Sequence, residues 1–165
     1  MQRKIVGALF VGTLVALLIY SVRDAIIKRS PQYVLEQESI PYQEEAIEFF
    51  NENKDRLLLL SDSRSTFTDL ASGFNHYSFQ YTDLDKLEIS DDLKVALSEM
   101  EHSTSKQYDV GLLPDRVDVR IYSGTHLYVV LTDRYDMCYG MEEDWDIVTD
   151  LGDGWSLHVA YVVRG

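Results

Sequence analysis

The chain has 165 residues, with 28 acidic and 15 basic side chains and a formal net charge of -13. Residues 1–29 hold five of the basic groups and one acid, so residues 30–165 carry a charge of -17. So acidic a body is a poor partner for nucleic acid, because phosphates are bound by lysine and arginine. With nine glycines, three prolines and one cysteine, the chain is neither a collagen nor a disulfide scaffold.

The first predicted element is a membrane span. From Ile5 to Val22 the sequence has 18 residues without a charge. A helix of that length covers about 27 Å, close to the roughly 30 Å hydrocarbon core of a bilayer. We therefore expect residues 1–29 to be a membrane anchor with one transmembrane helix over about residues 5–22. A short tail before the span and a long domain after it are typical of a signal-anchor protein, with the domain outside the cytoplasm.

A cleaved signal peptide is the competing interpretation. Cleavage requires small residues at positions -3 and -1 of the site. Ser21 at -1 places Ile19 at -3, and Ala25 at -1 places Arg23 at -3. Both are poor sites, so the uncleaved single-pass anchor is the favoured interpretation.

A stripe of small residues runs along the predicted span at Ala8, Gly12 and Ala16. Spacing of four residues places them on one helix face, where small side chains allow two membrane helices to approach closely. Weak self-association through this stripe is one interpretation. The other is composition alone, because apolar helices are rich in alanine and glycine.

The predicted helices follow a short linker. Residues 30–39 show no clear periodicity and are expected to be that linker, and residues 40–165 one acidic domain. Start signals and helical spacing predict a helix over about residues 40–60, a second over residues 67–74 that ends near Gly73, and a third that begins at Ser90.

Strand patterns dominate the second half of the domain. Apolar and polar residues alternate over residues 117–122 and 127–131, and further strands are predicted over residues 77–81, 135–140, 145–151 and 155–163. Gly152, Asp153 and Gly154 form a strong hairpin signal. The expected fold is α+β: two or three helices packed on a four- to five-stranded antiparallel meander. In layout alone this is similar to cystatin and NTF2-type folds, and no family motif accompanies the likeness.

Metal and catalytic motifs are sparse. An acidic run could offer oxygen ligands to Ca²⁺, but it lacks the EF-hand pattern, so a solvated strand edge is the favoured interpretation. The run comprises Glu142, Glu143, Asp144, Asp146, Asp150 and Asp153. The four histidines, at positions 76, 102, 126 and 158, are widely separated and are expected to be exposed or partly packed. Cys138, the only cysteine, is expected to be a small buried side chain.

No residue is assigned to catalysis, to a cofactor or to a metal on these patterns. Tyrosines 128, 135, 139 and 161 in or beside the predicted sheet either fill the core or form a binding face. The favoured function is a single-pass cell-membrane protein that displays an acidic extracytoplasmic domain, with a binding or accessory role in the cell envelope and a protein partner there. The alternative is a membrane-anchored enzyme with a pocket between the helices and the curved sheet.

Overall fold

The computed structural model describes residues 2–27, 30–67, 76–80, 82–104, 106–137, 139–140 and 146–162, with the side chains of the first helix described from Thr13 onward and that of His76 left out. The helical elements are α1 (Gln2–Ile27), α2 (Pro31–Tyr33), the π-helical η1 (Val34–Glu38), α3 (Ile40–Ser63), the 3-10 turns η2 (Arg64–Thr66) and η3 (Leu84–Lys86), and α5 (Asp91–His102). The strands are β1 (His76–Ser78), β2 (Asp109–Leu112), β3 (Val117–Ser123), β4 (Leu127–Thr132), β5 (Asp146–Gly152) and β6 (Trp155–Tyr161).

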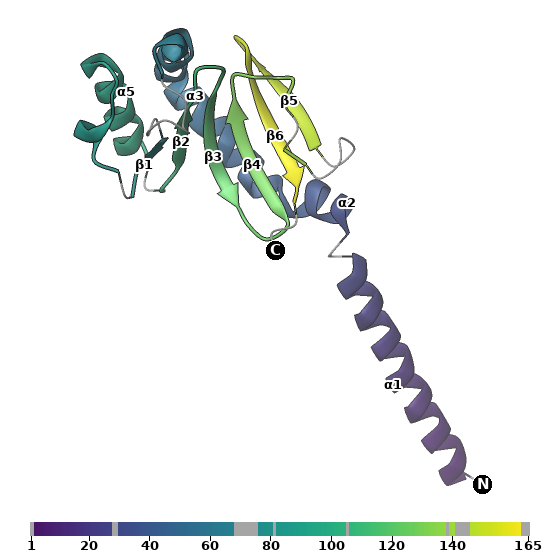
Figure 1. Cartoon of the computed structure of the whole chain (residues 1–165). Helices are drawn as coiled ribbons and strands as arrows, with labels where there is room; N and C mark the ends of the chain where they lie inside the picture. Colours follow the sequence, from purple (N-terminus) through teal and green to yellow (C-terminus); the bar gives the residue numbers. More distant parts are fainter. Residues whose placement is uncertain are drawn as a thin grey trace.

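Helix α1 extends away from the domain (Figure 1). Its large hydrophobic side chains from Leu14 to Ile27 are 45–71% exposed. None of them belongs to the hydrophobic core. Within the part of the chain that the structure describes, none of the helices combines the length and the apolar character needed to cross a bilayer.

The α+β fold is confirmed, with one six-stranded antiparallel sheet and helix α3 across one of its faces (Figure 1). Helix α3 buries Phe49, Phe50, Leu57 and Leu60 toward the sheet, and Phe50 packs 6.1 Å from the ring of Trp155. Buried positions recur every three or four residues along α3, the spacing that places them on one helix face: Ala46, Phe49, Phe50, Asn53, Leu57 and Leu60.

The strand order corrects the expected meander. The order is β1-β2-β3-β4-β6-β5, so the last strand lies between β4 and β5 instead of at the edge. All seven residues of β6 are buried. In β5, by contrast, Ile147, Thr149, Asp150 and Gly152 are exposed. The apolar strand β6 therefore lies inside the sheet and the acidic strand β5 at its edge, where charge discourages pairing with other chains. The Gly152–Gly154 turn joins them as expected, with a positive φ at all three residues.

Two segments differ from their expected structure. Residues 30–39 are helical instead of irregular, because Ser30 caps α2 and Pro31 occupies its first turn. Val34 and Leu35 of this segment are 1% and 4% exposed and pack in the core.

The second difference concerns the strand expected over residues 135–140, because the described residues of this segment are in turns and irregular structure. Cys138 lies outside the described residues. Most of the helix expected over residues 67–74 lies outside them as well. Strand β2, which the sequence patterns did not predict, pairs with β1 and β3.

Asp133 ties the end of α3 to the sheet. Its carboxylate is 4% exposed and accepts hydrogen bonds from the backbone N–H of Val117 at 2.7 Å, from Ser61 Oγ at 2.8 Å and from Arg64 Nη1 at 3.1 Å. The three donors satisfy a carboxylate that would otherwise be costly to bury.

Candidate functional site

A serine, a histidine and an aspartate meet on the sheet face opposite α3. Ser156 and His158 alternate along β6 with Trp155 and Leu157, which point to α3. Ser156 Oγ lies 3.1 Å from His158 Nε2, and His158 Nδ1 lies 3.5 Å from Asp146 Oδ2 on the neighbouring strand β5. The order of contacts is that of a nucleophile, a base and an orienting acid.

Burial argues against a catalytic role for these three side chains. Ser156 and His158 are both 0% exposed, and the side chain of Asp146 is 3% exposed. A serine nucleophile must reach the reacting carbon of a substrate, and this arrangement leaves no surface through which a substrate could approach. We therefore interpret the three residues as a structural network, here called the buried triad.

The backbone N–H of Tyr139 donates to Asp146 Oδ2 at 2.6 Å, and the Tyr139 ring lies edge-on to His158 at 5.2 Å. Ser156 Oγ also lies 3.4 Å from the carbonyl oxygen of Thr132. The Tyr139 segment thus covers the triad, and it does so without the strand that the sequence predicted there.

A second polar group continues across the same face. Tyr139 donates its hydroxyl to Asp118 at 2.9 Å, and Arg116 donates Nε to the same carboxylate at 2.8 Å. Beside them Arg120 donates to Tyr128 at 2.9 Å and to Asp109 at 3.0 Å. Arg116 pairs with Asp118 and Arg120 with Asp109, so neither of these two described arginines is left unpaired for an anionic ligand.

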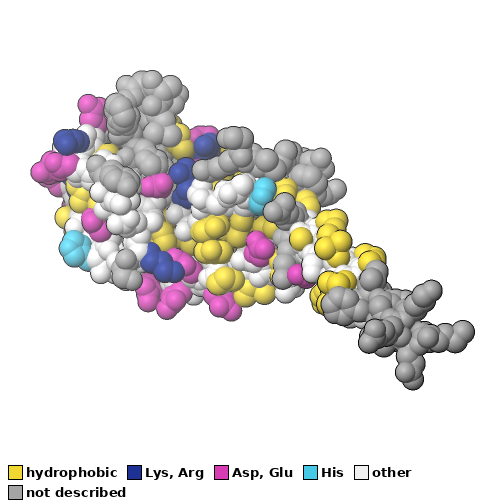
Figure 2. Space-filling view, turned by 90° about the horizontal axis from the view of Figure 1, so that it is seen from below, with side chains coloured by type: hydrophobic (Ala, Val, Ile, Leu, Met, Phe, Trp, Pro, Cys, Tyr) yellow, Lys and Arg dark blue, Asp and Glu magenta, His cyan; other side chains and the backbone are white. Residues whose placement is uncertain are grey.

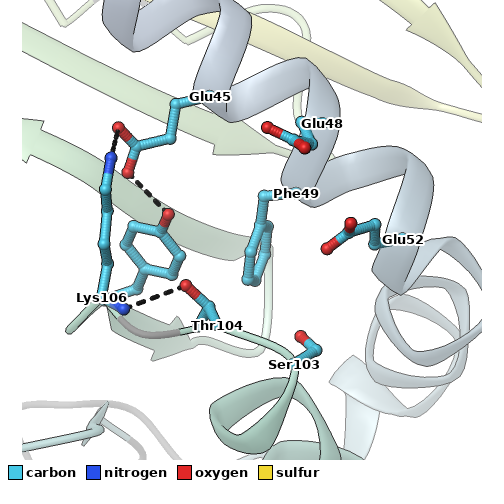
Figure 3. A pocket seen from close by; sticks show the side chains of 8 residues that line it. Glu45, Glu48, Phe49, Glu52, Ser103, Thr104 and Lys106 are labelled. Atoms are coloured by element: carbon cyan, nitrogen blue, oxygen red, sulfur yellow. Dashed lines mark hydrogen bonds and ion pairs between the residues drawn. The ribbon is translucent and has the colours of Figure 1, made fainter.

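A small pocket of about 240 Å³ opens between α3 and the segment that leads from α5 into β2 (Figure 3). Glu45, Glu48 and Glu52 approach it from α3, and Lys106 pairs with Glu45 across it. Tyr108 donates its hydroxyl to Glu45 at 2.6 Å and packs edge-on against Phe49 at 4.8 Å. The pocket is a recess in an acidic helix face, already partly filled by the chain's own lysine.

Three tyrosines donate their hydroxyls to carboxylates and are called here the carboxylate-bonded tyrosines: Tyr77 to Glu101, Tyr108 to Glu45 and Tyr139 to Asp118. Burial raises the pKa of all three above the ordinary value of 10.0. Charge repulsion from each partner carboxylate raises these pKa values further. The phenols therefore stay protonated across the physiological range and act as donors.

A larger cavity, of about 470 Å³, lies where the domain begins. Its walls include Glu38 of η1, Tyr42 of α3 and two residues around the β3–β4 turn, Tyr122 and His126. The rings of Tyr42 and Tyr122 stack with centroids 3.9 Å apart. The Nδ1 atom of His126 is buried and has no hydrogen-bond partner among the described residues. We call this the anchor-side cavity.

The sequence expectations for single residues have mixed outcomes. His102 is exposed and His126 is half-buried, as expected, but His158 is fully buried. Asp146 was expected on a solvated edge and is instead buried against His158. Asp150 is exposed, and Asp153 pairs with Lys54.

Glu142, Glu143 and Asp144 lie outside the described residues. In the small-residue stripe, the surroundings of Ala8 and Gly12 are also not described, whereas Ala16 is exposed. Among the described residues no group of His, Cys, Asp and Glu could hold a metal ion. The sequence predicted the β5–β6 hairpin, but the buried triad was missed because Asp146 and His158 were expected at or near the surface. Nothing in the local pattern shows that the Tyr139 segment covers this face of the sheet.

Comparison with known proteins gives no relative: no family model, no curated protein and no solved structure matches the chain.

Proposed function

We propose that this is a single-pass protein of the cell membrane whose helix α1 anchors an acidic α+β domain outside the cytoplasm, where the domain binds or supports another component of the cell envelope. The observation that carries the proposal is the exposed apolar surface of α1. Its side chains from Leu14 to Ile27 lie outside the domain core. Exposed apolar surface of this extent is unfavourable in water and favourable in lipid.

The sequence supports the same placement. The uncharged stretch from Ile5 to Val22 lies within α1 and has the length of a bilayer span. The domain after it carries a charge of -17, which repels an anionic membrane surface and favours a partner of complementary charge. Binding is favoured over catalysis because the buried triad has no access for a substrate.

Alkaline carbonate extraction of membranes tests the anchor. We expect the full-length protein to stay in the membrane pellet, because carbonate removes peripheral proteins and leaves spanning helices in place. Recovery of the protein in the carbonate supernatant would refute the anchor.

Labelling with a membrane-impermeant thiol reagent tests the orientation. Two single-cysteine variants in a Cys138→Ser background, Lys86→Cys and Gln2→Cys, place a thiol on either side of the proposed span. Lys86 is a suitable site because its side chain is 78% exposed. On intact cells we expect Lys86→Cys to react and Gln2→Cys to react only after lysis, and the reverse pattern would place the domain in the cytoplasm.

The alternative function is a membrane-anchored hydrolase that uses the buried triad. The 3.1 Å contact between Ser156 and His158 is the observation in its favour. Hydrolysis of simple nitrophenyl esters by the full-length protein, lost in Ser156→Ala and kept in the matched variant Ser61→Ala, would replace the binding proposal with this one.

A further inference from the structure

The anchor-side cavity lies on the side of the domain from which α1 leaves. Glu38 belongs to η1, which begins seven residues after the end of α1. Figure 1 shows α2 and the turn between β3 and β4 on the same lower side of the molecule, toward which α1 extends. Figure 2 views that side and shows hydrophobic side chains gathered in its middle, with acidic side chains around them. If α1 spans the bilayer, this face meets the headgroup layer.

The walls of the cavity combine three kinds of group that suit a protonated amine. The carboxylate of Glu38 supplies a negative charge and hydrogen-bond acceptors. The stacked rings of Tyr42 and Tyr122 supply aromatic surface of the kind that attracts ammonium groups. His126 lines the same cavity and adds a third kind of group, an imidazole ring, beside the carboxylate and the phenols.

We propose that the anchor-side cavity binds the headgroup of phosphatidylethanolamine, an inference that rests on the proposed membrane anchor. The primary ammonium has three N–H donors for Glu38 and its neighbours, whereas the quaternary ammonium of phosphatidylcholine has none. The headgroup of phosphatidylglycerol has no cation at all and is repelled by the acidic domain. An amine headgroup at this site would hold the domain against the membrane surface in spite of its charge of -17.

Native mass spectrometry of the full-length protein tests the proposal, using micelles that contain equal amounts of the three lipids with identical acyl chains. We expect retained phosphatidylethanolamine to exceed either other lipid by about tenfold, the ratio that one charge-assisted hydrogen bond supplies. Glu38→Gln should remove that preference. Glu36→Gln is the matched control, because it removes the same charge from the same helical turn at a residue that does not line the cavity.

The outcomes separate the two proposals. Carbonate-resistant protein that retains the three lipids equally, or prefers phosphatidylglycerol, overturns the headgroup site and leaves the anchor standing. Equal loss of preference in Glu38→Gln and Glu36→Gln also overturns the site, because it shows a general effect of charge. Release of the protein by carbonate overturns the anchor, and the headgroup site with it.

Discussion

Replacing His158 by alanine tests whether the buried triad stabilises the fold. The imidazole is fully buried. Its removal leaves the Asp146 carboxylate, 3% exposed, with the backbone N–H of Tyr139 as its one remaining hydrogen-bond donor among the described residues. Removing one partner of a buried hydrogen bond costs about 1–3 kcal/mol, and more where the group left behind is charged, because that group has already lost its contacts with water. We expect His158→Ala to lower the free energy of unfolding by that amount, measured by urea titration of the full-length protein in micelles with the fluorescence of buried Trp155.

A double-mutant cycle with Asp146→Asn isolates the pairing. Asparagine keeps an acceptor for Tyr139 N–H and removes the charge, so His158→Ala should cost at least about 1 kcal/mol less in the Asp146→Asn background. The control is Leu131→Ala, which opens a cavity on the opposite face and should cost about 2–5 kcal/mol equally in both backgrounds. A coupling between Asp146 and His158 within about 0.5 kcal/mol of zero would refute the reasoning, because it would mean that the two side chains stabilise the fold independently.

Three further perturbations follow from contacts described above. A Cβ added at Gly124 would lie 2.7 Å from the Tyr122 hydroxyl oxygen, so Gly124→Ala should displace that ring from its stack and lower stability by about 1 kcal/mol in thermal unfolding. Gly111→Ala should not, because its added Cβ would meet no described atom closer than 3.7 Å. In urea titration, Asp133→Ala should lower the free energy of unfolding by about 3 kcal/mol, because it removes the buried acceptor. Arg64→Ala should lower it by less than about 1 kcal/mol, because the arginine is 44% exposed. Equal losses would contradict the role of Asp133 as the buried tie between α3 and the sheet. The carboxylate-bonded tyrosines have pKa values raised above 10.0, so their stabilisation is complete below pH 10 and is lost as pH rises beyond it. Tyrosinate absorbance should therefore show them ionising together with unfolding, and their ionisation in the intact fold would show that the hydroxyls are free.

Local patterns were enough to predict several elements. The third predicted helix, which begins at Ser90, is α5, and its apolar side chains at Leu93, Ala96, Leu97 and Met100 are all buried. Alternation over residues 117–122 predicted β3, whose burial alternates in the same way up to Ile121. These features depend on residues within one turn or a few positions along one strand, so the chain alone determines them.

The sequence also determined that the chain has two chemically unlike parts, an uncharged stretch before Val22 and an acidic domain after it, because composition needs no folding to be read. The order of the sheet could not be obtained in that way, since β6 pairs with both β4 and β5. Pairing depends on which apolar face is buried deepest once α3 has packed, and that is a property of the whole core. The predicted hairpin brings Asp146 to His158, but only the tertiary structure covers that face with the Tyr139 segment and brings the β3–β4 turn to the cavity beside η1. The tertiary structure therefore decided that the triad is buried and where the anchor-side cavity lies.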